Sequence, residues 1–273
     1  MALTGPGREP PAGRVRAPAR WREPALLIAH ESGYSMPMHA AVLLFPGTNA
    51  DAEMVRTLRD VVHVPTTVLW HTEHELPAAT DLVAIPGGFS YGDYLRCGAL
   101  AASSPILGAL GRYAAQGGFV LGVCNGFQIL TEAGLLPGAL TRNAHLRFEC
   151  RDIHVRVDGV GPFTSELGQV LRLPIAHAEG AYTADEATLG ALERQNAVAL
   201  RYCDASGQST PESNPNGSLR AIAGIYGGPK RNVLGLMPHP ERMSERLHGG
   251  DDGKRLFEAV VQSVAARSRG VVR

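Results

Sequence analysis

Cys124 is the residue of this chain whose surroundings most clearly suggest chemistry. It follows a short apolar run, residues 119–123, and lies between Gly122 and Gly126, after which a helical pattern begins. This is the layout of a nucleophile elbow, in which a strand ends in a sharp turn that exposes one side chain. Glycines on both sides would keep their own Cβ atoms out of the path to the sulfur. We therefore predict that Cys124 is a nucleophile.

A cysteine nucleophile needs a base beside it, because a free thiol has a pKa of about 8.5 and is mostly protonated at neutral pH. The amides at the start of the helix after Gly126 would supply part of the positive field. The base is expected in residues 238–242, Pro-His-Pro-Glu-Arg, which follow a strand-like apolar run. Prolines hold that segment extended, so His239 and Glu241 would share a face. A carboxylate orients an imidazole, which predicts a triad of Cys124, His239 and Glu241.

The remaining cysteines and histidines give no sign of a metal or disulfide site. Cys97, Cys150 and Cys203 form no Cys-x-x-Cys pair and have no histidine at zinc spacing, so we interpret them as reduced thiols. His71 and His74 have a spacing that a helix could use for a metal, but their segment follows a strand-like run, and we predict no metal site. No Gly-x-x-x-x-Gly-Lys phosphate loop occurs, so ATP is not expected to bind this chain.

Composition is consistent with one folded α/β domain. The chain has 273 residues, 44% of them hydrophobic, and a formal net charge of +0. That balance gives no general attraction to nucleic acid or membranes, and no run approaches the ~18 apolar residues of a membrane span. Unpaired cysteines, one of them needed as a thiolate, favour a reducing compartment and hence the cytoplasm.

The first part of the chain differs in composition from the rest. Residues 1–38 are rich in Pro, Gly and Arg and contain one short apolar run, residues 25–29. This composition cannot form a packed core, and it does not match a targeting segment. We predict that residues 1–38 are either a non-native extension, with translation starting at Met36 or Met38, or a disordered extension. Residues 39–273 then form the folded domain.

Strand and helix patterns alternate from residue 40 onward. Strands are predicted over residues 40–45, 66–70, 81–85, 119–123, 153–157, 170–174, 198–202, 221–226 and 233–237. Helices are predicted over residues 50–61, 105–116 and 253–265, and directly after Gly126. Such alternation implies parallel strands with right-handed crossovers, and the predicted fold class is α/β, a single open, mainly parallel sheet flanked by helices. Cys124 and His239 each follow a strand, so both would reach the edge where sites collect.

Residues 122–128, Gly-Val-Cys-Asn-Gly-Phe-Gln, and residues 237–242, Met-Pro-His-Pro-Glu-Arg, together resemble the class I, triad-type glutamine amidotransferases. Further segments resemble, within that class, the glutaminase subunits of phosphoribosylformylglycinamidine synthases. These segments are residues 45–49, 86–96, 176–180 and 214–218. The likeness extends over roughly residues 39–265 and implies a flavodoxin-like architecture.

The resemblance implies hydrolysis of glutamine to glutamate and ammonia through a thioester on Cys124, with His239 transferring the protons. Ammonia would pass to a partner synthetase subunit that uses ATP to convert formylglycinamide ribonucleotide into its amidine, a step of purine biosynthesis. No cofactor is expected in this subunit; ATP and Mg²⁺ are expected on the phosphoribosylformylglycinamidine synthetase subunit. A small accessory subunit is a further expected partner.

Other residues are candidates for binding the substrate and the oxyanion of the tetrahedral intermediate. The amide of Asn125 and the amide of Gly88 or Phe89 are the candidate oxyanion donors, and glycine would let the backbone approach the substrate closely. The resemblance adds residues that would line the glutamine pocket or contact the synthetase: Gln128, His177 and Glu179.

Alternative functions use the same elbow. Another class I amidotransferase subunit, or a cysteine hydrolase of similar fold, would need the same three side chains. A non-catalytic docking subunit would keep the fold without the chemistry. The complete set of Cys124, His239 and Glu241 favours an enzyme, and the lack of a recognisable synthetase domain favours a separate partner.

Overall fold

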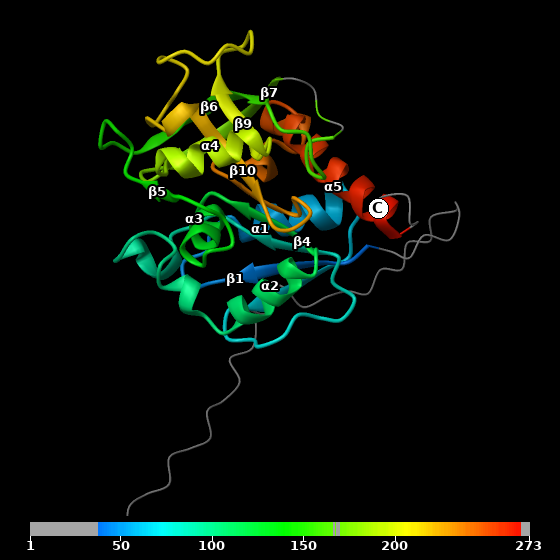
Figure 1. Ribbon diagram of the computed structural model, residues 1–273. Coiled ribbons are helices and arrows are strands. Elements are labelled where there is room, and N and C mark those ends of the chain that lie inside the picture. The colour runs from blue at the N-terminus through cyan, green and yellow to red at the C-terminus, as the bar shows by residue number, and fades with distance from the viewer. Residues whose placement is uncertain (1–37, 166, 168–169, 269–273) are drawn as a thin grey trace, which may run out of the picture. The chain divides into compact units, whose positions relative to one another are not determined.

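The computed structural model describes residues 38–165, 167 and 170–268. Except for Met38, the predicted extension over residues 1–38 lies outside the described residues. Within the described chain, helices flank a nine-stranded sheet, and a separate sheet has two strands (Figure 1). The predicted α/β class is confirmed.

One half of the large sheet is parallel and carries the crossover helices. Its strands are β1 (Ala40–Leu44), β2 (Thr66–Trp70), β3 (Leu82–Ile85), β4 (Phe119–Val123) and β11 (Val233–Leu236), in the order β2-β1-β3-β4-β11. Every residue of β1, β3, β4 and β11 is buried, as expected for parallel strands covered on both faces. The strands predicted for this half are confirmed to within a residue at either end.

The other half of the sheet is antiparallel. Beyond β11 it continues with β10 (Ile222–Gly227), β9 (Val198–Cys203), β6 (Glu149–Val157) and β7 (Val170–His177). β6 begins at Glu149, four residues before the predicted residue 153. The prediction missed these first residues because they are largely exposed and show no apolar pattern. β7 continues past Pro174, which an edge strand tolerates.

The helices are α1 (Asp51–Arg56), α2 (Ile106–Ala115), α3 (Asn125–Glu132), α4 (Glu186–Arg194) and α5 (Asp252–Ser268). The predicted helix over residues 50–61 is α1 followed by a π-helical turn, Thr57–Val61. α4 was not predicted, and neither was the two-stranded sheet of β5 (Ala139–Thr141) and β8 (Ala181–Thr183). Short 3₁₀ turns cover Ser90–Asp93, Ala101–Ser103, Leu219–Ala221, Pro240–Met243 and Arg246–His248.

The pairing of β4 with β11 brings together the two segments that carry the predicted triad. In this parallel pair Val123 lies opposite Leu236, so both strands end at the same level. Cys124 follows β4 directly, and residues 237–239 follow β11. Strand register therefore delivers both segments to one point on the carboxyl edge of the sheet.

Candidate active site

Cys124 is held in a strained backbone conformation between β4 and α3. Its φ of 52° and ψ of −106° are uncommon for a residue with a side chain. Its amide donates to the Leu236 carbonyl at 2.8 Å, and its own carbonyl accepts from the amides of Phe127 and Gln128. Bonds to β11 on one side and to α3 on the other thus fix the turn that a nucleophile elbow requires.

The glycines beside Cys124 serve packing. A Cβ atom on Gly126 would lie 2.1 Å from the carbonyl oxygen of Ile85 in β3, and one on Gly122 would lie 2.7 Å from the carbonyl oxygen of Gly126. Both positions therefore need glycine so that α3 can begin directly against the sheet. The sequence had suggested instead that these glycines clear the approach to the sulfur.

His239 and Glu241 form a buried ion pair. The Nδ1 atom of His239 lies 2.6 Å from Oε1 of Glu241, and the two side chains are 2% and 0% exposed. The predicted reason for their pairing, an extended segment, is wrong beyond His239. Pro240 begins a 3₁₀ turn, as proline favours at a first helical position, and that turn brings the carboxylate of Glu241 back to the ring. The amide of His239 also donates to the Pro174 carbonyl at 2.8 Å, which ties this segment to β7.

The imidazole of His239 and the side chain of Cys124 meet at Gly87. A Cβ atom on Gly87 would lie 2.6 Å from Cε1 of His239 and 3.3 Å from Cβ of Cys124, so only glycine fits between them. The sulfur of Cys124 is 3.8 Å from the Ala176 carbonyl oxygen. Cys124, His239 and Glu241 thus come together; their catalytic roles remain a prediction.

Electrostatics favour the protonated form of His239. Burial lowers the pKa of its imidazole, but the negative charges of Glu241 and Cys124 outweigh burial, and the pKa of His239 is raised. Among the described residues, Nε2 of His239 has no hydrogen-bond partner within bonding distance. In enzymes without substrate, the hydrogen bond between a nucleophile and its base is often long, and it tightens when substrate binds. The arrangement can hold a proton on Nε2, beside the sulfur.

Of the two proposed oxyanion donors in the turn after β3, the amide of Phe89 is already occupied. It donates to the Gly47 carbonyl at 2.9 Å, whereas no partner is found for the Gly88 amide among the described residues. Asn125 is the first residue of α3, where amides have no acceptor within the helix. The geometry therefore favours the amides of Gly88 and Asn125.

Only glycine fits at position 88, because a neighbouring loop packs closely against it. A Cβ atom on it would lie 2.6 Å from the Gly47 carbonyl oxygen, and one on Gly47 would lie 2.2 Å from the Phe89 carbonyl oxygen. The loop of residues 46–49 and the turn of residues 87–91 are also joined by backbone hydrogen bonds, including Tyr91 to Pro46 at 2.6 Å. This contact accounts for glycine at position 88, for which the sequence had suggested close approach to substrate.

Side-chain amides connect the turn after β3 to the loop after β7. Oδ1 of Asn125 accepts from the Ser90 amide at 3.1 Å, and Nδ2 of Asn125 donates to Oε1 of Gln128 at 2.8 Å. Nε2 of Gln128 then donates to the carbonyl oxygen of Glu179 at 2.6 Å. Gln128 is buried, and both ends of its amide are bonded within the protein. Its predicted contact with substrate remains a prediction.

His177 and Glu179 lie at the end of β7 and just beyond it. His177 is buried and neutral, because burial, followed by the charge of His239, lowers its pKa to about 4. The carboxylate of Glu179 lies 3.6 Å from Nε of Arg142. Both residues border the site, and their substrate or partner roles stay predictions.

Sequence reasoning missed several residues that build the site. Gly87 leaves room for the His239 ring beside Cys124, and Asn143 and Asn216 contact His177. Asn216 belongs to a segment that the resemblance had marked, residues 214–218, but without a role. Nothing in the pattern around Asn143 distinguishes it from an ordinary loop residue.

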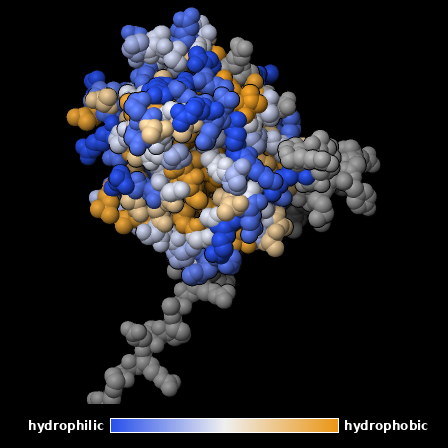
Figure 2. Space-filling model, in the orientation of Figure 1, coloured by the Kyte–Doolittle hydropathy of each residue, from blue (hydrophilic) through white to orange (hydrophobic). Residues whose placement is uncertain are grey.

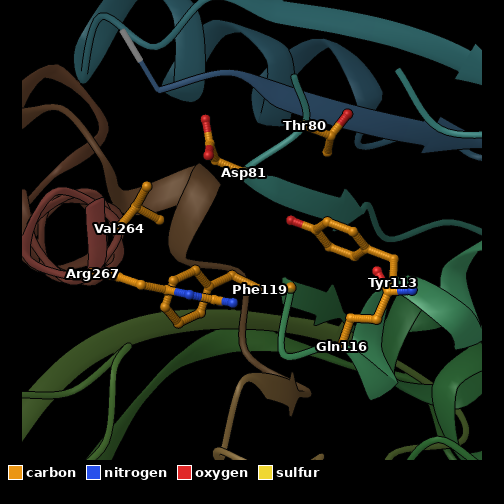
Figure 3. Close-up of a pocket in the computed structure, with 8 residues that line it drawn as sticks. Thr80, Asp81, Tyr113, Gln116, Phe119, Val264 and Arg267 are labelled. Carbon is orange, nitrogen blue, oxygen red and sulfur yellow. The ribbon is translucent and has the colours of Figure 1, made fainter. Parts of the chain in front are cut away.

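Figure 3 shows the residues that line a cavity of about 380 Å³. It borders Asp81, just before β3, and Phe119, the first residue of β4, and Tyr113 and Arg267 also line it. Because Cys124 follows the other end of β4, this cavity is separate from the candidate active site.

Other features of the described chain concern metals, thiols and membranes. All four cysteines of the sequence are free, and in the described ranges no three His, Cys, Asp or Glu side chains gather as a metal would need. His71 contacts the Tyr91 hydroxyl at 3.1 Å. Among the described helices, none combines the length and apolar character of a membrane span.

Comparison with known proteins identifies the family. A family model described as the CobB/CobQ-like glutamine amidotransferase domain matches residues 37–252. Phosphoribosylformylglycinamidine synthase subunit PurQ of Rhodospirillum rubrum is 54% identical over 231 residues, which are 84% of this chain and 100% of the relative. The subunit of the same name from Bradyrhizobium diazoefficiens is 54% identical over 228 residues, 82% of this chain and 97% of the relative.

A solved structure agrees with these relatives. A chain in the structure of PurLQS from Thermotoga maritima has a TM-score of 0.72 and 37% sequence identity, over 83% of this chain and 99% of that chain. The fold and the matched residues cover the whole elbow, from β4 to α3, and the segment after β11. This chain belongs to the CobB/CobQ-like glutamine amidotransferase domain family.

Proposed function

We propose that this chain is the glutaminase subunit of a phosphoribosylformylglycinamidine synthase, which hydrolyses glutamine and supplies ammonia to an ATP-dependent synthetase subunit. The observation that carries the chemistry is the buried pair of His239 and Glu241, 2.6 Å apart, beside Cys124 on a strained elbow. The identity of the relatives supports the choice of synthase, since they carry that name and match over nearly their whole length.

The first chemical step forms the tetrahedral intermediate that precedes the thioester. The sulfur of Cys124 attacks the carbon of the glutamine carboxamide while the thiol proton resides on Nε2 of His239. The carbonyl oxygen becomes an oxyanion, which the amides of Gly88 and Asn125 stabilise. Removing one such donor typically lowers the rate by about 10² to 10³-fold. Glu241 keeps the imidazolium oriented and neutralises its charge.

The second step releases ammonia and restores the enzyme. Nε2 of His239 donates its proton to the leaving nitrogen, the carbon–nitrogen bond breaks, and a thioester remains on Cys124. Water then attacks the thioester carbon and gives a proton to His239 as it does so. The bond between the carbon and the sulfur breaks, glutamate leaves, and Cys124 is released as a thiolate while the proton stays on Nε2 of His239, which regenerates the starting state.

Exposed apolar side chains near the site support docking to a synthetase. Tyr94 and Leu95, in the loop after β3, are 89% and 61% exposed, and Leu146 and Phe148 after β5 are 75% and 50% exposed. Apolar groups protrude in two places at the left edge of Figure 2, where Figure 1 shows these loops. Exposed apolar groups gathered around a site are typical of a partner surface.

The complex would work in the cytoplasm, where a nucleophilic thiol stays reduced. The synthetase subunit would bind ATP and Mg²⁺, and a small accessory subunit would complete the complex. The comparison structure from Thermotoga maritima carries the name PurLQS, which supports such an assembly.

Replacement of Cys124 by Ala tests this function in the complex reconstituted with the synthetase and accessory subunits. We expect formylglycinamidine ribonucleotide to form from ammonia at nearly the wild-type rate, and glutamine-dependent formation to be abolished. Cys150→Ala is the matched control, because that thiol is free and exposed. Loss of both activities in Cys124→Ala would contradict the assignment, and unchanged glutamine use would indicate a non-catalytic docking subunit.

A glutamine-mimicking diazo-ketone provides an independent test of the nucleophile. Intact and peptide mass spectrometry should locate one adduct on Cys124, and Cys124→Ala should remain unlabelled. Turnover of glutamine with a different synthetase, and none with the formylglycinamide ribonucleotide enzyme, would instead favour another class I amidotransferase.

A further inference from the structure

A second buried imidazole, that of His177, lies within the electrostatic reach of His239 and has no part in the proposed reaction. It comes from the last residue of β7, one residue after Ala176, whose carbonyl faces the sulfur of Cys124. A positive charge on His177 would repel the proton that His239 must hold. The protonation state of His177 therefore matters to the site.

Asn143 and Asn216 contact opposite nitrogens of the His177 ring. Oδ1 of Asn143 lies 3.2 Å from Nδ1 of the ring, and Nδ2 of Asn216 lies 3.5 Å from Nε2. A carboxamide oxygen only accepts a hydrogen bond and a carboxamide nitrogen only donates one. The two contacts are satisfied together only when Nδ1 carries the hydrogen and Nε2 keeps its lone pair, which is a neutral tautomer.

The backbone fixes the orientation of the Asn143 amide. Its Oδ1 also accepts from the Gly180 amide at 3.1 Å, and its Nδ2 donates to the carbonyl oxygens of Arg147 and His177 at 2.8 and 2.9 Å. A flipped amide would place oxygen against two carbonyls and nitrogen against a donor. Oδ1 therefore faces the ring, which makes Nδ1 of His177 the protonated nitrogen.

The Asn216 amide is fixed in the same manner. Its Nδ2 donates to the Gly180 carbonyl at 2.8 Å, and its Oδ1 accepts from the amide and hydroxyl of Ser218 at 3.0 and 2.8 Å. The same Nδ2 also contacts the Tyr202 hydroxyl at 3.3 Å. Both asparagines are 0% exposed, so water does not compete for these groups.

Gly180 packs closely against the His177 ring. A Cβ atom on Gly180 would lie 2.4 Å from both Cε1 and Nδ1 of His177, so only glycine permits this ring position. Gly180 also bonds to both asparagines through its amide and its carbonyl. Gly180 and Asn216, which come from two segments that the sequence marked separately, thus join Asn143 in one buried clamp around the His177 imidazole.

Some groups around His177 raise its pKa and others lower it. Glu149, opposite it on β6, favours a proton on His177, whereas His145 and His239 oppose one. Glu149 is itself paired with Nε2 of His145 at 3.1 Å and with Nε of Arg151 at 2.9 Å. The Arg151 guanidinium therefore already balances the charge of Glu149.

We propose that Asn143 and Asn216 are positioning residues that keep His177 as a neutral Nδ1–H imidazole, so that the proton of the site stays on His239. The catalytic consequence rests on the proposed glutaminase function. A neutral His177 lets His239 remain protonated beside Cys124 and donate its proton to ammonia. A cationic His177 would displace that proton and remove the general acid.

Nuclear magnetic resonance of the full chain labelled with ¹⁵N-histidine tests the clamp without any assay of activity. We expect His177 to show the Nδ1–H tautomer and no titration between pH 6 and 8. An Nε2–H tautomer, or titration within that range, would overturn the proposal. Absence of glutamine-dependent turnover in the complex at every pH would refute the proposed function. The tautomer of His177 would still test the clamp by itself, because the resonance measurement does not depend on activity.

The variant Asn216→Asp replaces the donor that faces Nε2 with a carboxylate, which favours a proton on His177. In the complex, we expect its activity relative to wild type to fall roughly tenfold between pH 8.5 and pH 6, because an opposite charge within about 4–6 Å can raise a pKa by up to about three units, which would protonate most of His177 at pH 6. Asn214→Asp is the matched control, since Asn214 bonds to the Ser218 carbonyl and has no bond to His177. A loss equal at both pH values would indicate a merely structural role.

A double variant separates charge from fold. Asn216→Asp combined with His177→Gln removes the group that takes up the extra proton. We expect the ratio of activities at pH 8.5 and pH 6 to return to that of His177→Gln alone. A persistent acid-side loss in the double variant would contradict the proposal.

Discussion

Replacing Glu241 by Gln tests how far the buried carboxylate supports catalysis. Oε1 of Glu241 lies 2.6 Å from Nδ1 of His239, and both side chains are almost fully buried. The amide keeps the shape but removes the charge that raises the pKa of His239. Breaking one partner of a buried ion pair typically costs about 3–5 kcal/mol, because the other charge is left uncompensated.

If the barrier to glutamine hydrolysis rises by that whole range, the rate falls by roughly 10² to 4 × 10³-fold, at about 1.4 kcal/mol per factor of ten. We therefore expect glutamine-dependent kcat to fall by about that factor in Glu241→Gln. Ammonia-dependent synthesis by the complex should be unchanged. Glu245→Gln is the matched control, since Glu245 lies on the same segment but pairs at the surface with Arg56.

The rate at which iodoacetamide alkylates Cys124, followed against pH, gives a second measurement. In wild type the protonated imidazole of His239 favours the thiolate of Cys124, which is the form that iodoacetamide alkylates. Glu241→Gln lacks the charge that favours a proton on His239, so alkylation of Cys124 at neutral pH should be slower in this variant. A variant that retains glutamine turnover within tenfold of wild type, with an unchanged alkylation profile, would refute this account of the triad.

Two further predictions concern stability. Gly126→Ala should lower stability by about 1–3 kcal/mol, measured by urea unfolding, because its Cβ atom would lie 2.1 Å from the Ile85 carbonyl oxygen; Gly111→Ala in α2, where nothing lies within 4 Å, should instead be neutral or stabilising by up to ~1 kcal/mol. For His177, the folded pKa of about 4 is below the unfolded value of 6.5, so the unfolded chain takes up the proton first as pH falls. Stability should therefore decrease from pH 6.5 toward 4, by an amount on the order of 3 kcal/mol, and His177→Gln should lack this component. Equal pH dependence in wild type and His177→Gln would contradict that assignment.

The strands and the elbow could be predicted because their signals are local. An apolar run such as residues 119–123 must be buried on both faces, and glycines around Cys124 mark a turn. Paired prolines around His239 likewise marked a special segment, although the turn at Pro240, which the extended interpretation missed, is what seats Glu241. The structure and the comparisons confirm the fold class and the family, while residues 1–38 stay a prediction.

The sequence by itself determined which residue types stand at the ends of which strands, because hydrophobic periodicity and glycine spacing are written along the chain. Only the tertiary structure decided that the Phe89 amide is occupied by Gly47, and that Asn143 and Asn216 clamp His177. These contacts join residues far apart in the chain, and a hydrogen bond depends on distances of a few tenths of an ångström that no local pattern encodes. Strand register sets those distances, and register is a property of the assembled sheet.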